Sequence, residues 1–202
     1  MSSTDAVLDK VRAAAHGKHT ARRPRWPQSE EDAMDVLETM AARYSVRSYK
    51  ADAVEDQKLA QVLEAARLAP TAANRQPFRL IVLRTAGREE ELRRVYSRPW
   101  FTTAPIVLGI VAVPAEAWRR MDAKPYDEVD ATIAMDHVVL AATGLGLGTC
   151  WIAAFNPAAT REVLGLPDDV EPIAFTPLGY AADAPGQKKR RPLDELVKYD
   201  RW

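Results

Sequence analysis

Cysteine and histidine are scarce in this chain. Cys150 is the single cysteine among 202 residues, which excludes an internal disulfide and a metal site built from several thiolates. The three histidines, at positions 16, 19 and 137, leave few ligands for a zinc enzyme. If the chain is an enzyme, we therefore expect its reactive group to come from an organic cofactor.

The chain also lacks an excess of charge and a long apolar run. Its 28 Lys and Arg residues balance 28 Asp and Glu residues, which argues against a general nucleic-acid binder. No apolar run approaches the roughly 18–20 residues of a transmembrane helix, and the opening MSSTDAVLDK has no signal-type apolar core. We expect a globular, cytoplasmic protein that binds neither nucleic acid nor membrane.

Basic residues are concentrated at the N-terminus. Residues 1–27 carry six Lys or Arg and two Asp, and the segment ARRPRWPQ has no hydrophobic period. We expect residues 1–30 to form a basic extension that is partly disordered or packs on a partner subunit, with a short helix at 6–15. A tail that grips nucleic acid is the alternative. Residues 31–202 are expected to form the folded domain.

From residue 30 onwards, hydrophobic periodicity predicts helices separated by short apolar strands. The first helix has Ser29 as its expected N-cap and Leu37 and Met40 on one apolar face, together with Ala33, Met34 and Ala41. The predicted helices are 29–46, 55–70, 87–98, 128–148 and 156–166, and the predicted strands are 79–84, 105–114, 149–155 and 171–181. In the longest helix we expect Val129, Ile133, His137, Leu140 and Ala141 to face inward. This pattern predicts an α+β fold with four or five strands covered by helices.

Two motifs invite a catalytic interpretation that their context does not favour. The glycines of Gly144–Gly148 follow a helix and precede a strand, whereas a dinucleotide fingerprint needs the reverse order. We expect them to end the helix and to let it pack closely on the sheet. Cys150 would need a base such as His137 to act as a nucleophile, and we favour a buried structural cysteine.

Donor groups recur in the segment that follows the first helix. Arg43, Ser45 and Arg47 alternate, and alternate residues of an extended chain point to the same side. Guanidinium groups match phosphate oxygens, so this row suits a phosphate and polar hydroxyls. A strand edge with solvated arginines is the alternative.

Two further segments could complete such a site. Residues 69–78, APTAANRQPF, form a loop of small and amide side chains, in which Asn74 can both donate and accept hydrogen bonds, as a flat heterocycle requires. An ordinary helix–strand connection is the alternative. Residues 188–191 are four consecutive cations that either anchor a phosphate or are simply solvated.

Taken together, these segments resemble the FMN-dependent nitroreductase family. RYSVRSY, APTAANRQPF, GLGTCWIAAF with NPAATREVLGLP, and PLGYA with KKRRPLDELV occur in the family's order and approximate spacing, over about residues 35–200. The resemblance implies a nitroreductase-like α+β fold with a mostly antiparallel sheet. It also implies an intertwined homodimer with FMN at the subunit interface.

The resemblance also implies roles for individual residues. Arg43, Tyr44 and Ser45 would contact the phosphate and ribityl chain, and Arg47 would stabilise charge at N1 and O2 of the ring. Pro70, Thr71, Ala72 and Asn74 match the loop contributed by the partner, and Trp151, Ile152, Ala153 and Ala154 match the strand that passes N5. Lys188 and Arg190 match the phosphate clamp. Ala73, Phe78 and Ala153 depart from residues common in the family, which affects fine positioning.

The implied activity is hydride transfer from NADPH or NADH through flavin N5 to a small flat acceptor, such as a nitroaromatic or quinone, in a ping-pong cycle. No side chain of this chain need act as acid or base. The aromatic candidates for the acceptor pocket are Tyr96, Trp100, Phe101, Trp118 and Tyr126. Dehalogenation, enoate reduction, flavin fragmentation and a non-catalytic flavin-binding dimer remain alternatives.

Overall fold

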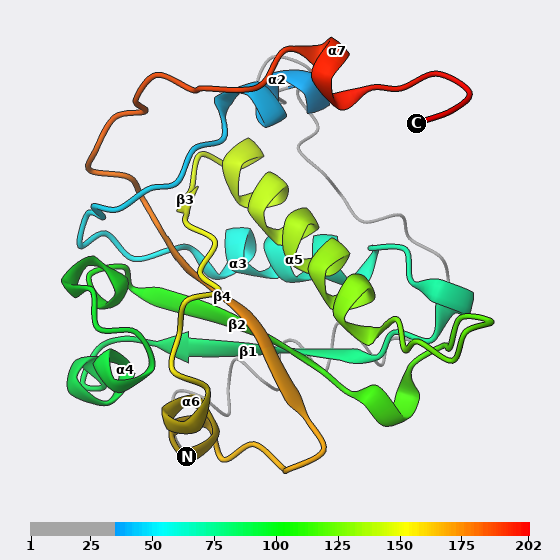
Figure 1. The fold of residues 1–202 in the computed structure, drawn as a ribbon. Helices are drawn as coiled ribbons and strands as arrows, with labels where there is room; N and C mark the ends of the chain where they lie inside the picture. Colours follow the sequence, from blue (N-terminus) through cyan, green and yellow to red (C-terminus); the bar gives the residue numbers. More distant parts are fainter. Residues whose placement is uncertain (1–34) are drawn as a thin grey trace, which may run out of the picture.

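The computed structural model describes residues 35–202 as an α+β fold built around a four-stranded antiparallel sheet (Figure 1). The strands lie in the order β1-β2-β4-β3. The predicted fold class is therefore confirmed, with four strands. The predicted extension 1–30, its helix at 6–15 and the Ser29 cap lie outside the described residues.

Most predicted elements are present with shorter bounds. The helices are α2 (Val36–Ala42), α3 (Asp56–Arg67), α4 (Glu89–Val95), α5 (Asp127–Gly144), α6 (Pro157–Leu164) and α7 (Leu193–Leu196). The strands are β1 (Phe78–Arg84), β2 (Ile106–Ala112), β3 (Gly148–Thr149) and β4 (Glu171–Gly179). The short 3-10 helices are η1 (Ala72–Asn74), η2 (Pro99–Thr102) and η3 (Pro114–Glu116). The predicted strand 149–155 is reduced to β3 and one isolated bridge, between Ile152 and Phe175.

Helices cover both faces of the sheet, so its central strand is buried throughout. In β2 the side chains of Ile106, Leu108 and Ile110 pack with α3 and α5. Val107 points to the opposite face and packs with residues around α4 and η2. This alternation follows from the two-residue period of a strand. The apolar run 105–114 is continuous because both of its faces are core.

The register of the sheet determines which residues lie at each of its two ends. Phe78 of β1 pairs with Ala112 of β2 at one end, and Arg84 pairs with Ile106 at the other. Ile106 in turn pairs with Leu178 of β4, next to β3. Six residue steps at about 3.3 Å separate Phe78 from Arg84, so the two ends lie about 20 Å apart. The Phe78 end of β1 and the Ile106–Leu178 end of the sheet are therefore well separated within one chain.

The predicted inner face of α5 is only partly right, because Ile133 and Ala141 pack against the core while Val129 does not. The buried side chains include Ala131, Ala134, Met135, Val138 and Ala142, which pack between α3 and the sheet. Val129 is exposed, whereas Ile133, His137, Leu140 and Ala141 are half-buried. Small residues let the helix approach its neighbours closely, so its packed face is marked by alanines. A search for large apolar side chains at helical spacing selects the neighbouring strip of the helix surface instead of the alanine face.

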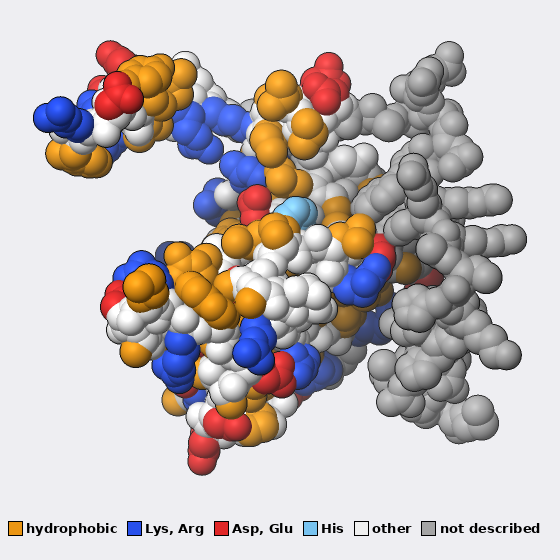
Figure 2. Space-filling model, turned by 90° about the vertical axis from the view of Figure 1, so that its right-hand side faces the viewer, with side chains coloured by type: hydrophobic (Ala, Val, Ile, Leu, Met, Phe, Trp, Pro, Cys, Tyr) orange, Lys and Arg blue, Asp and Glu red, His pale blue; other side chains and the backbone are white. Residues whose placement is uncertain are grey.

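The predicted apolar face of α2 is exposed in the described chain. Leu37 is 69% exposed and Met40 is 50% exposed, while Thr39 is buried. Leu193, Leu196, Tyr199 and Trp202 are exposed as well. The C-terminal segment that carries them projects from the body at the top of the molecule, and its apolar side chains lie among charged ones (Figures 1 and 2). Large exposed apolar side chains of this kind are typical of an interface.

Within residues 35–202, no helix combines the length with the apolar character that a bilayer span requires.

Candidate functional site

The segment after α2 lies against β3 at one end of the sheet. Ser45 forms a parallel bridge with Thr149, and the Val46 amide donates to the Thr149 carbonyl at 2.9 Å. A Cβ atom at Gly148 would lie 2.7 Å from a Val46 methyl carbon, which is closer than carbon atoms pack. Glycine at 148 therefore permits the contact that places the arginine row.

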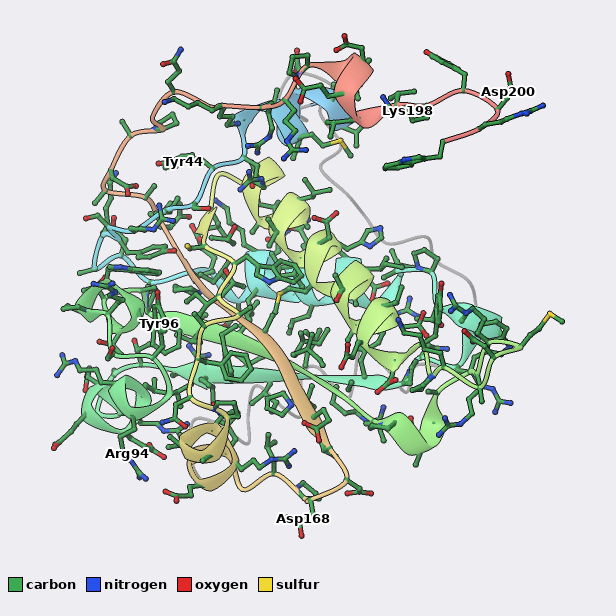
Figure 3. The ribbon with its side chains drawn as sticks, viewed as in Figure 1. Tyr44, Arg94, Tyr96, Asp168, Lys198 and Asp200 are labelled. Atoms are coloured by element: carbon green, nitrogen blue, oxygen red, sulfur yellow. The ribbon has the colours of Figure 1, made fainter. Side chains whose placement is uncertain are left out.

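Asp183 accepts hydrogen bonds that hold the same segment in place. Its side chain accepts a hydrogen bond from the Arg47 amide at 2.9 Å and another from the Tyr44 hydroxyl at 3.2 Å. The Tyr44 hydroxyl also donates to the Asp183 carbonyl at 2.8 Å (Tyr44 is labelled in Figure 3). Burial and the Asp183 carboxylate raise the pKa of Tyr44, which keeps its hydroxyl a donor. Asp183 was not among the sequence candidates, because one acid in the irregular stretch after a strand belongs to no pattern.

The predicted row of donors surrounds Cys150. Burial raises the pKa of the Cys150 thiol, and Arg47, the Ser45 side chain and Arg43 act in the opposite direction. The Arg47 guanidinium also lies 6.0 Å from the centre of the Trp100 ring, where a cation–π attraction holds it. The thiol is 4% exposed, so the prediction of a structural cysteine agrees with its placement.

The basic C-terminal stretch returns to the same end of the fold. The Lys188 ammonium donates to the carbonyl of Ala41, in the last turn of α2. Arg190 lies two residues further along and bonds to the Lys189 carbonyl at 3.0 Å. Lys188 is thereby brought to the helix end from which Arg43 continues, although 145 residues separate the two in sequence.

These cations have no carboxylate partners in the described chain. Seven arginines elsewhere form ion pairs with Asp or Glu: Arg67, Arg79, Arg84, Arg88, Arg94, Arg120 and Arg161. Arg43, Arg47, Lys188 and Arg190 pair with no Asp or Glu of residues 35–202, as is also true of scattered cations such as Arg93. What distinguishes Arg43, Arg47 and Lys188 is that they gather around Cys150 and the end of α2. A group of uncompensated cations around a hydroxyl is the donor set that a phosphate monoester requires.

Residues 151–154 continue from the same strand and present one face outward. The Ile152 amide and carbonyl bond to Phe175 at 2.8 and 2.9 Å, and the Ile152 side chain is buried. Trp151, Ala153 and Ala154 are exposed. The structure therefore leaves the small side chains of this stretch, and the backbone beside them, accessible to a ligand.

The loop 70–76 lies at the opposite end of the sheet. It leads into Phe78, whereas Ser45 lies near the Ile106 and Leu178 end. Pro70, Ala73 and Asn74 are exposed, and Thr71 and Ala72 are half-buried. Of the sequence-predicted site residues, the structure thus brings together those of 43–47, 151–154 and 188–190. It places the arginine row at the other end of the sheet from the loop, while Ile152 pairs with Phe175 in the middle of β4.

Left-handed backbone conformations distinguish this loop. Ala73, Asn74 and Gln76 have φ angles of 51°, 53° and 52°, although none of them is glycine. Each such residue costs about 1 kcal/mol or more, and strain of this kind persists where surrounding contacts enforce it. Strained, exposed backbone indicates a loop shaped for a ligand rather than for stability.

The aromatic candidates divide between the two ends. Tyr96 and Trp100 pack edge to face at 5.6 Å on the side of the arginine row (Tyr96 is labelled in Figure 3). Trp118 and Tyr126 form a similar pair at 5.6 Å, next to the start of α5. Phe101 is fully buried against Phe175, so its predicted place in an acceptor pocket is wrong. An apolar ring between a helix and a central strand is core.

The remaining motifs have structural roles in the described residues. Gly144 is the last residue of α5, and Gly146 has a φ of 75°, so the glycines end a helix as predicted. The His137 Nδ1 lies 3.1 Å from the Ile133 carbonyl of its own helix. Across residues 35–202, no three His, Cys, Asp or Glu side chains gather in a way that could hold a metal ion.

Comparisons with known proteins agree with this geometry. The family model described as "Nitroreductase family" matches residues 40–98 and 86–180. A nitroreductase family protein of Clostridium difficile 630 is 38% identical in sequence. The structural match has a TM-score of 0.76 and covers 84% of this chain and 100% of that one. The FMN reductase [NAD(P)H] of Bacillus subtilis is 29% identical over 179 residues, covering 80% of this chain and 72% of its own.

The tight contact between residues 46 and 148 makes a testable prediction. Replacing Gly148 by Ala forces Val46 away from β3, and overpacking of this kind costs about 1–3 kcal/mol of unfolding free energy. Gly186 has open space around its Cβ position, so Gly186→Ala is the matched control and should stay within about 0.5 kcal/mol of the wild type. Thermal and urea unfolding measure both variants. Equal stability of the two variants would contradict the close packing.

Proposed function

The chain belongs to the nitroreductase family, and on that premise we propose that it is an NAD(P)H-dependent flavin oxidoreductase that reduces a small flat acceptor such as a nitroaromatic or quinone. The observation that carries the proposal is the group of cations without carboxylate partners around Ser45. The resemblance to an enzyme named FMN reductase [NAD(P)H] supports the choice of cofactor and electron donor.

The residues present fit FMN. Its phosphate would be held by Arg43, Lys188 and Arg190, because their charges are not neutralised by neighbouring acids in the described chain. The Ser45 hydroxyl and the Tyr44 segment would serve the ribityl chain. When bound, FMN supplies hydride chemistry that no side chain here can perform, accepting hydride at N5 from the nicotinamide and delivering it to the acceptor.

The side chains around the flavin ring would stabilise its charge and orient it, and none of them would take part in the reaction itself. Arg47 would offer a cation to the pyrimidine edge, and Trp100 and the Asp183 bond to its amide restrain its position. The exposed stretch Trp151–Ala154 would leave backbone groups free beside N5. No titratable side chain need move a proton, which agrees with the single described histidine being bonded to its own helix.

We further propose that the complete site needs two chains. Pro70, Thr71, Ala72 and Asn74 lie about 20 Å along the sheet from the arginine row, so a twofold partner would bring its loop to this row. The exposed face of α2 and the projecting C-terminal segment provide apolar surface for such a dimer (Figure 2). The FMN-binding domain is proposed to span residues 31–202, with the basic extension 1–30 as an accessory.

The phosphate clamp predicts a loss of cofactor. Arg43→Ala and Arg190→Ala each remove a charge-assisted contact worth about 1.5–3 kcal/mol, so FMN affinity should fall about ten- to hundred-fold. Arg93 is exposed on α4, so Arg93→Ala is the control that removes the same charge elsewhere. Fluorescence titration of the FMN-free protein measures the dissociation constants. Unchanged affinity in both site variants would remove the clamp from the proposal.

A site shared between chains predicts complementation. One chain carries Arg43→Ala with Arg190→Ala, the other carries Thr71→Ala with Asn74→Ala, and two different tags isolate the mixed dimer. If the clamp and the loop come from different chains, the mixed dimer has one intact site and one doubly defective site. It should bind about half as much FMN as the wild-type dimer, because the two sites are related by the twofold axis.

The outcome of this experiment separates the two arrangements. Sites built within single chains would each carry a defect, so the mixed dimer would bind no more FMN than either parent.

The proposed reaction predicts a two-stage optical change. NADPH or NADH should bleach the absorbance of the bound flavin anaerobically, and a nitroaromatic or quinone should then restore it. Stopped-flow absorbance follows both stages. Restoration by an enoate or a halogenated aromatic alone would assign the alternative chemistry. Absence of bleaching by either nicotinamide would identify a flavin-binding protein without this activity.

A further inference from the structure

Two carboxylates are buried in the first turn of α5. Asp127 is 3% exposed and Asp130 is 1% exposed, and their spacing of three residues places them on one side of the helix. Asp127 Oδ1 and Asp130 Oδ2 have no hydrogen-bond partner. Ionisable side chains are rarely buried without partners, because burial removes their hydration. The positive end of the helix dipole favours acids at this position, but it does not explain why they are buried.

The fold alone gives little reason for a carboxylate at position 130. An apolar side chain of similar size would remove the unpartnered oxygen, and the Ala72 amide that it releases is only half-buried, so water can replace the lost acceptor. Asp130 does make one contact outside its helix, where its Oδ1 accepts a hydrogen bond from the Ala72 amide at 3.0 Å. Ala72 is the first residue of η1, at the start of the strained loop.

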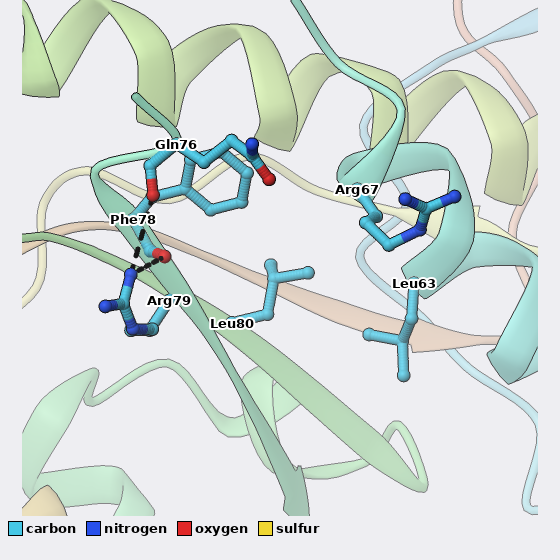
Figure 4. A pocket seen from close by; sticks show the side chains of 6 residues that line it. All are labelled: Leu63, Arg67, Gln76, Phe78, Arg79 and Leu80. Atoms are coloured by element: carbon cyan, nitrogen blue, oxygen red, sulfur yellow. Dashed lines mark hydrogen bonds between the residues drawn. The ribbon is translucent and has the colours of Figure 1, made fainter. Parts of the chain in front are cut away.

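Apart from the Asp130 bond, the hydrogen bonds of this loop lie within it or at its junction with the sheet, where the Val113 amide donates to the Pro77 carbonyl at 2.8 Å. The Gln76 amide donates to the Thr71 hydroxyl at 3.1 Å, and the Asn74 amide donates to the Thr71 carbonyl at 3.0 Å. At the far end Arg79 donates to the Phe78 carbonyl at 2.8 Å (Figure 4). The bonds from Thr71 lie within the loop itself, whereas the Asp130 bond ties its start to the rigid helix α5.

We propose that Asp130 is a positioning residue that holds the loop 71–76 in the conformation that receives FMN from the partner's arginine row. This inference rests on the proposed function, because that function assigns the loop to the cofactor. Burial raises the pKa of Asp130, the Ala72 amide opposes this, and Asp127 adds to the rise. The bond to the loop is therefore the one neighbouring contact that favours the ionised carboxylate. The carboxylate is retained at position 130 for the shape of the loop and not for the stability of the domain.

Three variants separate positioning from a purely structural role. Asp130→Leu removes the acceptor and fills the space, Asp130→Asn keeps an oxygen that can accept from Ala72, and Asp136→Asn removes a charge from the exposed face of the same helix. The first measurement is amide hydrogen exchange over residues 70–77 in the FMN-free protein. The others are thermal unfolding of that protein and fluorescence titration with FMN.

Loss of the acceptor should loosen the loop and leave the fold intact. We expect Asp130→Leu to unfold at the wild-type temperature or above, to exchange about ten-fold faster over 70–77, and to bind FMN about ten-fold more weakly. Asp130→Asn should restore both loop protection and FMN affinity to within about three-fold, because an amide oxygen accepts the same bond. Asp136→Asn should match the wild type in every measurement.

Several results would overturn the inference. Wild-type exchange and wild-type affinity in Asp130→Leu would show that the loop does not depend on this carboxylate. Unfolding of Asp130→Leu at a lower temperature than the wild type would show that the Asp130 side chain serves the fold. If the wild-type protein binds no FMN, the proposed function fails, while exchange over 70–77 still decides whether Asp130 holds the loop.

Discussion

The register of β1 against β2 separates the two halves of the candidate site, and the rest of the arrangement follows from that separation. The cation row lies against β3, at the end of the sheet where Leu178 pairs with Ile106, whereas the strained loop leads into Phe78 at the opposite end. Seven consecutive ladder pairs fix this spacing, so no adjustment of side chains can close it. A ligand that needs both halves must therefore lie between two copies of the chain. On the proposed function, a dimer would complete the site as well as cover apolar surface.

In each half of the candidate site, a carboxylate holds a backbone segment in place by accepting a hydrogen bond from an amide. At the cation row, Asp183 binds a backbone amide and a tyrosine hydroxyl, so it orders the segment without neutralising the arginines. At the loop, Asp130 binds a backbone amide from a buried position and leaves its second oxygen unpartnered. In both cases an acid positions main chain and leaves the ligand-facing groups free. An ion pair in either place would have reduced the attraction for an anionic ligand.

Local sequence predicted the elements better than it predicted their packed faces. Proline and glycine bracket α6 as expected, with Pro157 at its start and Gly165 at φ 61° after its end. The predicted apolar faces of α2 and α5 do not match their packed faces, for two physical reasons. Alanines mark the packed face of α5, because close approach needs small side chains. The large apolar residues of α2 find no cover among the described residues, and a pattern within one chain carries no information about a second copy.

The sequence by itself determined the fold class, the order of the elements and the residue types of the site, because periodicity, turn residues and donor chemistry are local properties. It contained the arginine row, the loop of small and amide residues and the C-terminal cations as separate segments. Only the tertiary structure decided which of them meet, because proximity depends on strand register and on close contacts such as that of Val46 with Gly148. The tertiary structure also revealed the hydrogen bonds that Asp183 and Asp130 accept from distant backbone amides. Single acids in ordinary surroundings acquire a role only when folding places a distant backbone amide against them.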